Sequence, residues 1–183
     1  MFGTDVANVN TFSTSNILTM GRLDAPYIHL SYSQVQFQLA ECAVRGIIAG
    51  NAKTYYQNGV RAAMTELSIF NSSFAIPSSK IDAYLIQNPY NPATTDDALN
   101  IINTQYWIET HYNWYEAFAN MRRSGYPKIY DQLDLTIPAN NGAVLPRRLT
   151  YPPSEVASDP HLQDAIKRQG PDVTSSRMWW DKQ

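Results

Sequence analysis

Two amphipathic segments joined by a short loop constrain the fold of this chain more than any other feature of its sequence. In residues 33–45 the apolar side chains share one helical face, which holds Val35, Leu39 and Cys42, widened by Phe37 and Ala40. After residue 51 a second face of this kind holds Tyr56, Val60, Ala63, Met64 and Leu67. Because both faces need covering and the loop is short, we predict two helices packed antiparallel as a hairpin.

The ends of these two segments have the chemistry of helix boundaries. Ser33 is predicted to cap the first helix and Gly46 to end it, while Asn51 is predicted to cap the second. Glu41 and Arg45 support the first helix, because opposite charges four residues apart attract across one turn.

A short helix is predicted over residues 80–87, introduced by Pro77 and Ser78 and ended by the Pro- and Asn-rich loop 88–92. A further helix begins near residue 114, because apolar side chains again share one face: Trp114, Ala117, Phe118 and Met121. Residues 124–127, Ser-Gly-Tyr-Pro, are predicted to stop it.

Between these two, Thr95 is predicted to cap a helix that runs through Tyr106. Asp96 and Asp97 lie in its first turn, where the helix dipole favours negative charge.

The two ends of the chain are predicted to be irregular. Residues 1–30 have neither helical nor strand periodicity, and we interpret them as a lead continuing from a missing N-terminal half. Residues 128–183 are predicted to be a loop-rich segment that packs on the helices, and their breaks are Pro138, 140–142, Pro146, Pro152 and Pro153. Asp159 and Pro160 are predicted to open a last short helix that ends at Gly170. The fold class is therefore all-α, with residues 31–127 as the helical hairpin domain.

The composition favours neutral polar ligands. Only 16% of residues are charged, where about 25% is usual, and the chain has 12 Tyr and 4 Trp. Aromatic faces and uncharged hydrogen-bonding groups suit sugars, whereas the net charge of −2 offers nucleic acid no electrostatic attraction. The sequence has no apolar run long enough to span a membrane and no signal peptide at residues 1–16. Either the protein is cytosolic, or its export signal lies on a part of the protein not present here.

Three segments, in this order, carry a family resemblance. Residues 22–26 and 30–46 resemble an "aP" followed by "T-Y-x-E-V-x-F-x-x-A-E-A-x-x-R-G", with Gln34 and Cys42 where Glu and Ala are more usual. Residues 113–127 resemble "E-A-W/F-x-x-x-R-R-T/S-G-x-P". Residues 146–155 and 178–181 resemble the closing "P-x-R-x-x-Y-P-x-x-E" and "W-W-D". Together they are similar to the C-terminal part of SusD/RagB proteins, in the SusD-like branch.

This resemblance implies a glycan-binding, non-catalytic protein without a cofactor. Such proteins are lipid-anchored on the outer face of the outer membrane of Bacteroidetes-type bacteria and act in carbohydrate uptake with a SusC-like TonB-dependent transporter. Their tetratricopeptide-like helical hairpins usually face the transporter, and loops elsewhere bind the glycan. The lipid-bearing cysteine lies near the N-terminus, which places it here on the missing part.

Other functions have weaker support in the residues. A helical-repeat scaffold that binds only protein would also explain the helix pairs, and a gene for a transporter immediately upstream would distinguish the two hypotheses. A small cytosolic enzyme would need groups such as Glu109 or His111, or a glycosidase pair of Glu109 with the acids at 96–97. No cofactor motif is present, and the three histidines lack metal-ligand spacing. Glu116, Arg122 and Arg123 are interpreted as structural, in contact with Glu155 or the chain end.

The aromatic residues divide into core and candidate ligand contacts. We predict a core position for four that lie on helical stripes, namely Tyr56, Tyr106, Trp114 and Phe118. Trp179 and Trp180 are predicted to clamp the tail on the helices. Tyr90, in the loop with Asn88 and Asn91, is the single candidate glycan contact, because an exposed ring beside amides suits a sugar.

Overall fold

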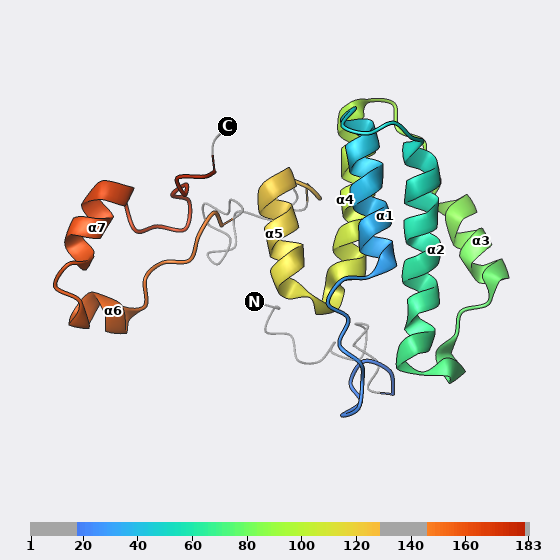
Figure 1. The fold of residues 1–183 in the computed structure, drawn as a ribbon, viewed down its shortest axis with the longest axis horizontal. Coiled ribbons are helices and arrows are strands. Elements are labelled where there is room, and N and C mark those ends of the chain that lie inside the picture. Colours follow the sequence, from blue (N-terminus) through green and yellow to red (C-terminus); the bar gives the residue numbers. More distant parts are fainter. Residues whose placement is uncertain (1–17, 129–145, 182–183) are drawn as a thin grey trace, which may run out of the picture. The chain divides into compact units, whose positions relative to one another are not determined.

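The computed structural model describes residues 18–128 and 146–181, and within these ranges it contains helices and no strand, which confirms the all-α prediction (Figure 1). The helices are α1 (Tyr32–Val44), α2 (Ala52–Phe70), α3 (Ser78–Gln87), α4 (Thr95–Glu109), α5 (Trp114–Ser124), α6 (Pro153–Ser158) and α7 (Leu162–Gln169). Two 3₁₀ turns, η2 (Ser72–Phe74) and η3 (Thr110–Tyr112), follow α2 and α4. The breaks predicted at Pro138 and 140–142 lie outside the described residues. The chain divides into two compact units, Met1–Asn120 and Met121–Gln183.

The predicted hairpin forms the centre of the first unit. Helix α2 runs back alongside α1, and α1 also packs on α4 while α3 packs on α2 (Figure 1). The core between them is made of Phe37, Ala40, Tyr56, Val60, Leu85, Ile102 and Tyr106. The Phe37 ring lies 6.3 Å from that of Tyr56 and 6.2 Å from that of Tyr106, so one residue of α1 joins three helices.

The buried face of α1 differs from the predicted stripe. Phe37 and Ala40 are fully buried, but Val35, Leu39 and Cys42 are only half-buried. Polar residues fill much of the buried face instead, and these are Ser33, Gln34, Gln36 and Glu41. Because α1 is covered by two helices, its buried face is wider than one apolar stripe. Polar side chains are tolerated there when they have partners, as Glu41 does in Arg45 at 2.8 Å.

Helix caps follow hydrogen-bond geometry more closely than residue type. The predicted cap Asn51 is confirmed, since its Oδ1 accepts from the Thr54 N–H at 3.2 Å. The prediction that Ser33 caps α1 was wrong. Ser31 caps this helix, because its Oγ accepts a hydrogen bond from the Gln34 N–H at 3.0 Å. The prediction of Thr95 was also wrong by one residue, because Thr94 caps α4 in a reciprocal capping box with Asp97.

Glycine ends the first predicted helix as expected. Gly46 directly follows the C-cap of α1 and has φ +70°, a left-handed conformation that residues other than glycine rarely adopt. Gly170 ends α7 with φ +100° in the same region.

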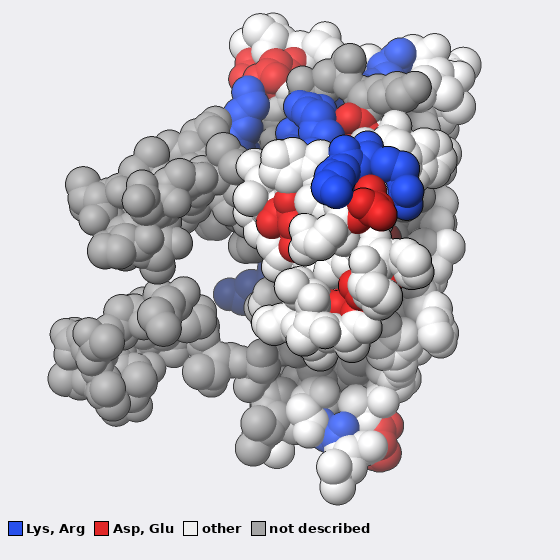
Figure 2. Space-filling model, turned by 90° about the vertical axis from the view of Figure 1, so that its left-hand side faces the viewer, with Lys and Arg blue, Asp and Glu red and all other residues white. Residues whose placement is uncertain are grey.

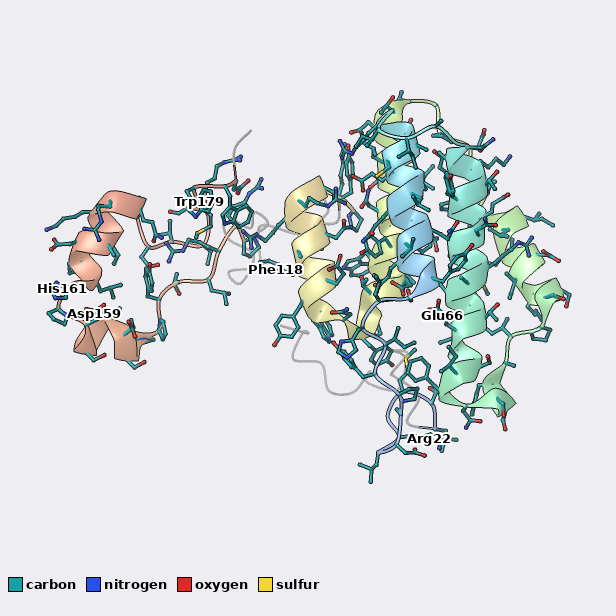
Figure 3. The ribbon with its side chains drawn as sticks, in the orientation of Figure 1. Arg22, Glu66, Phe118, Asp159, His161 and Trp179 are labelled. Carbon is teal, nitrogen blue, oxygen red and sulfur yellow. The ribbon has the colours of Figure 1, made fainter. Side chains whose placement is uncertain are left out.

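The second unit contains a helix that the sequence did not predict. Pro152 and Pro153 were interpreted as a break, but Pro153 opens α6, where the missing N–H of proline costs nothing. Helix α7 begins after His161 instead of at Pro160, and Asp159 accepts from the His161 N–H at 2.8 Å (Figure 3). Arg148, which precedes α6, makes an ion pair at 2.9 Å with Asp172, which follows α7.

The tail of the second unit is held by a guanidinium. The Arg122 guanidinium lies 4.7 Å from the centre of the Trp180 ring, a cation–π contact. This agrees with a structural role for Arg122 and with a clamp at Trp180, whereas Trp179 is largely exposed. Packing of residues 128–183 on the helices of the first unit stays a prediction.

The contact between Gly59 and Phe37 generates a test of the hairpin core. A Cβ added at Gly59 would meet Cε1 of Phe37 at 2.7 Å, and the buried ring is held by Tyr56 and Tyr106. Overpacking a core costs about 1–3 kcal/mol, against a gain of up to about 1 kcal/mol from the helix propensity of alanine. We expect Gly59→Ala to lower the midpoint of thermal unfolding.

Combining Gly59→Ala with Phe37→Leu provides the control for this prediction. The smaller leucine leaves room for the added methyl group, so the double variant should be less destabilised than the sum of the two single variants. Additive effects would show that the two residues do not compete for space.

Candidate functional site

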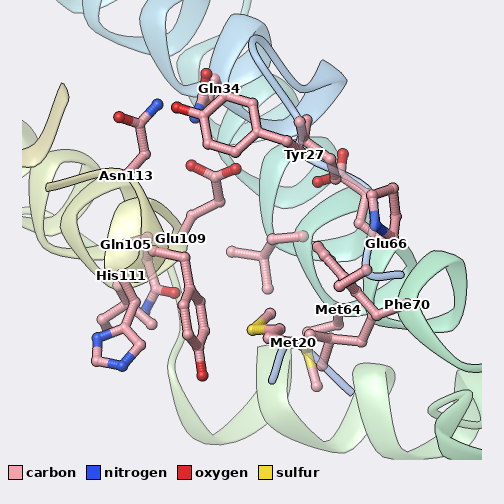
Figure 4. Close-up of a pocket in the computed structure, with 18 of the residues that line it drawn as sticks. Met20, Tyr27, Gln34, Met64, Glu66, Phe70, Gln105, Glu109, His111 and Asn113 are labelled. Carbon is pink, nitrogen blue, oxygen red and sulfur yellow. The ribbon is translucent and has the colours of Figure 1, made fainter. Parts of the chain in front are cut away.

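A cavity of about 670 Å³ lies between α2, the irregular segment 20–28 and the ends of α4 and η3 (Figure 4). One wall continues the apolar face of α2 and consists of Val60, Ala63, Met64, Leu67 and Phe70. Met20, Pro26 and Ile28 from the irregular segment complete the apolar lining. Ala63, Met64 and Leu67 were predicted to lie on the apolar face of this helix, and they are half-buried because they line this cavity.

Two carboxyl groups and two serines meet at one end of the cavity. Ser31 Oγ lies 2.6 Å from Ser33 Oγ and 2.8 Å from Oε1 of Glu109. Ser33 Oγ lies 3.0 Å from the same Glu109 oxygen and 3.2 Å from Oε2 of Glu66. Glu66 comes from α2 and Glu109 from the last residue of α4, so the packing of α1 on both helices brings them together.

Both carboxyl groups are shifted toward the protonated form. Burial raises the pKa of Glu109, hydrogen bonds with Ser31, Ser33 and Gln34 offset part of the shift, and the nearby charge of Glu66 raises the pKa further. Burial also raises the pKa of Glu66, against the opposing effect of its hydrogen bonds with Ser33. Ion pairs that would hold either pKa down are absent from the described part of the chain.

The structure does not bring together the glycosidase pair considered from the sequence. Asp96 and Asp97 lie in the first turn of α4 and Glu109 ends it, so they are separated by about 18 Å of helix. A catalytic carboxyl pair requires a separation of about 5–10 Å. Glu66 and Glu109 are closer to each other, and Ser33 Oγ contacts a carboxyl oxygen of both.

Exposed aromatic rings gather where α4 passes into α5. This aromatic corner consists of His111, Tyr112, Trp114 and Tyr115, all of them exposed, with Trp114 at 72% and Tyr115 at 88%. The His111 ring lies 4.8 Å from that of Tyr112 and 6.0 Å from that of Trp114. His111 and Tyr112 lie in the η3 turn, which separates α4 from α5.

The prediction that Trp114 lies in the core was wrong. Helix α5 buries Ala117, Asn120 and Met121, and Asn120 donates to Oδ1 of Asn103 at 2.8 Å. Trp114 belongs to the first turn of α5 and remains outside this contact, while Phe118 is half-buried. The predictions for Tyr56 and Tyr106 were correct, since both are almost fully buried.

The candidate glycan contact Tyr90 is placed against the core. Its ring lies 5.2 Å from that of Tyr56, it is half-buried, and burial raises its pKa. Asn88 donates to the Tyr84 carbonyl at 3.1 Å. The ring therefore does not stand free beside the amides as the sequence hypothesis assumed, and a contact with sugar at Tyr90 stays a prediction.

Within the described ranges, no group of His, Cys, Asp and Glu side chains is arranged to hold a metal ion. None of the helices there has the length and hydropathy to cross a membrane. Cys42 is half-buried on α1.

Comparison with known families shows which protein family the chain belongs to. Residues 2–152 match the SusD-like family described as starch-binding and associating with the outer membrane. The chain belongs to the SusD-like family. A search of curated proteins found no match.

Solved structures support the same assignment. A SusD-like protein of Bacteroidetes is 36% identical with a TM-score of 0.74, and the match covers 88% of this chain and 32% of that one. A chitin-binding protein is 34% identical with a TM-score of 0.68 over 86% of this chain and 34% of that one. A SusD homologue from Bacteroides fragilis is 29% identical with a TM-score of 0.69, covering 86% and 36%. The chain thus spans about a third of the length of these relatives. The similarity of its backbone to theirs confirms the tetratricopeptide-like helical fold of this part.

The carboxyl pair generates a prediction about stability and pH. A carboxyl whose pKa is raised in the folded state contributes stability below its ordinary value of 4.5 and loses it as the pH rises through the raised value. Glutamine does not ionise, so we expect Glu109→Gln to remove this loss. The difference in melting temperature, variant minus native chain, should therefore be more positive at neutral pH than near pH 4.5.

Glu155→Gln provides the control, because Glu155 is exposed on α6. Thermal melts of the three proteins across this pH range measure the effect. A difference between Glu109→Gln and the native chain that does not change with pH would contradict burial of an ionisable pair.

Proposed function

We propose that this chain is part of a non-catalytic glycan-binding protein of the outer membrane. The observation that carries the proposal is the match of residues 2–152 to a SusD-like family described as starch-binding and associating with the outer membrane. A solved relative is a chitin-binding protein, so polysaccharides built from glucose or from N-acetylglucosamine are the first ligands to test.

We also propose a partner and a location for the whole protein. The family resemblance implies that the whole protein acts with a SusC-like TonB-dependent transporter and is displayed at the cell surface through a lipid anchor outside this chain. The helical hairpins are then the part that faces the transporter. Co-purification of a tagged longer protein that contains this segment with such a transporter tests this partnership.

The aromatic corner is the candidate contact for glycan in this chain. Sugar rings present apolar C–H faces that pack on aromatic rings, and their hydroxyl groups bind neutral polar side chains. The described surface suits such a ligand, because most of it is uncharged in Figure 2 and the charged side chains form small mixed groups. The corner supplies three rings that neighbour one another, those of His111, Tyr112 and Trp114, whereas Tyr90 supplies one ring that packs on the core.

We expect Trp114→Ala to weaken glycan binding about tenfold, because a central aromatic contact accounts for about 1–2 kcal/mol or more of a binding site. Affinity electrophoresis through gels that contain soluble starch or glycol chitin measures the change. The matched control is Trp179→Ala, which removes an equally exposed tryptophan, 80% exposed, from the second unit.

Three outcomes are informative. Equal losses in both variants, or no loss in either, would show that the aromatic corner is not the contact. Absence of binding to any polysaccharide by a longer protein that carries this segment would contradict the proposed function as a whole. Co-purification of that protein with a transporter and no glycan binding would favour the protein-only scaffold.

A further inference from the structure

The second half of α2 has an apolar face that is only partly covered. Met64 and Leu67 continue the stripe that begins at Val60, with the i, i+4 and i+7 spacing through which one helix packs on another. Val60 is buried, whereas Met64 and Leu67 are half-buried and line the cavity (Figure 4). Beside them the cavity is lined by the irregular segment 20–28 instead of a helix. This face of α2 therefore has room for a further packing partner.

The cavity is large for a protein interior. It measures about 670 Å³, whereas close-packed interiors keep few voids larger than a water molecule. Its polar end is engaged within the chain, because Ser33 contacts Glu66 and Glu109, and Gln34 also hydrogen-bonds Glu109. What remains to be filled is the apolar part of the cavity.

The segment that leads into α1 presents further apolar side chains next to the cavity. Leu18, Leu23, Tyr27 and Leu30 are each more than half exposed, and Leu23 is fully exposed. Arg22 of this segment is paired with Asp24 at 2.6 Å and lies away from Glu66 (Figure 3). Apolar side chains gathered around a cavity are typical of a surface that another protein surface covers.

The part of the molecule best placed to cover this surface belongs to the same polypeptide. The matched structures are much longer than this segment, which spans between 32% and 36% of their length. Met20 lines the cavity and is among the first described residues, so a preceding part of the polypeptide is close to the cavity along the chain. A covalently attached segment also binds at an effective concentration in about the millimolar range, which favours it over a separate protein.

A second copy of the chain fits this surface less well. Symmetric dimers place the same surface of both copies in contact. Across this cavity, Glu66 and Glu109 of one copy would then approach the same residues of the other. Like charges brought together in this way disfavour an interface.

We propose that the cavity is an internal interface of the whole protein, filled by apolar side chains from the part of the polypeptide that precedes this segment. These side chains pack on Met64, Leu67 and Phe70, and the same contact covers the exposed apolar side chains of residues 18–30. The inference rests on the length of the relatives and not on glycan binding. Trp114 and Tyr115 lie outside the cavity lining, so the proposed glycan contact stays open.

Two neighbouring alanines of α2 provide a matched test in the longer protein. Ala63 lines the cavity and Ala62 does not, although both are half-buried. With Cys42 replaced by serine, we expect the thiol of Ala63→Cys to react with N-ethylmaleimide at least about tenfold more slowly than that of Ala62→Cys, because a thiol in a filled interface reacts only when the interface opens.

Mass spectrometry measures the labelling of each thiol, and each rate is taken relative to that of the same variant unfolded in urea. Equal relative rates at the two positions would overturn the proposal, because the cavity would then be open in the whole protein.

Photo-crosslinking identifies what fills the cavity. With p-benzoylphenylalanine in place of Phe70, which lines the cavity, we expect a crosslink within one polypeptide to a residue that precedes this segment. The matched control has the same group in place of Phe74, which is exposed in η2 outside the cavity lining, and should lack this crosslink.

A product of twice the mass would show that a second copy fills the cavity and would overturn the proposal. A crosslink confined to residues 1–183 would also overturn it, since the cover would then belong to this segment. Neither measurement uses a sugar, so a failure of this inference is distinguishable from a failure of the proposed glycan binding.

Discussion

The packing of α1 against both α2 and α4 is the constraint on which the rest of this structure depends. It buries Phe37 and Ala40 in a three-helix core, and it also buries Ser33, Gln34, Gln36 and Glu41 on the same helix. Buried polar groups need partners, and the neighbours of Ser33 are Glu66 from one helix and Glu109 from the other. The chemistry at the end of the cavity is thus a consequence of how the hairpin closes. Moving α1 by one residue would separate the serines from both carboxyl groups.

The sequence predicted those features that depend on spacing along the chain. The hairpin, the cap at Asn51 and the glycine after α1 all follow from local periodicity and from backbone chemistry, and all are present. The choice between Ser31 and Ser33, or between Thr94 and Thr95, could not be made in this way. Both members of each pair have a suitable hydroxyl, and only the position of the first helical N–H decides which one accepts it. Pro153 was wrongly interpreted as a break for a related reason. Proline both ends helices and begins them, and here it begins α6.

The candidate sites depend on contacts between helices, which periodicity does not describe. Trp114 shares a stripe with Met121, yet it begins α5 and is exposed, since none of the helices in the described ranges covers it. Glu66 lies between the apolar Met64 and Leu67, where an amphipathic helix ordinarily has polar residues, so the local sequence contained no signal that its position is special. Nothing in the local sequence of Glu109 indicates that it meets Glu66. That pairing arises from the same packing of α1 that buries Ser33.

The cavity and the aromatic corner differ in what they offer a ligand. The corner is exposed, with rings and few charges, so a sugar can bind there without losing much hydration of charged groups. At the end of the cavity, Ser33 contacts both Glu66 and Glu109, and burial raises the pKa of each carboxyl group. A protonated carboxyl group can donate a hydrogen bond, so the contacts among these side chains can be satisfied within the protein. The polar end of the cavity therefore engages itself, whereas the rings of the corner remain available to a ligand.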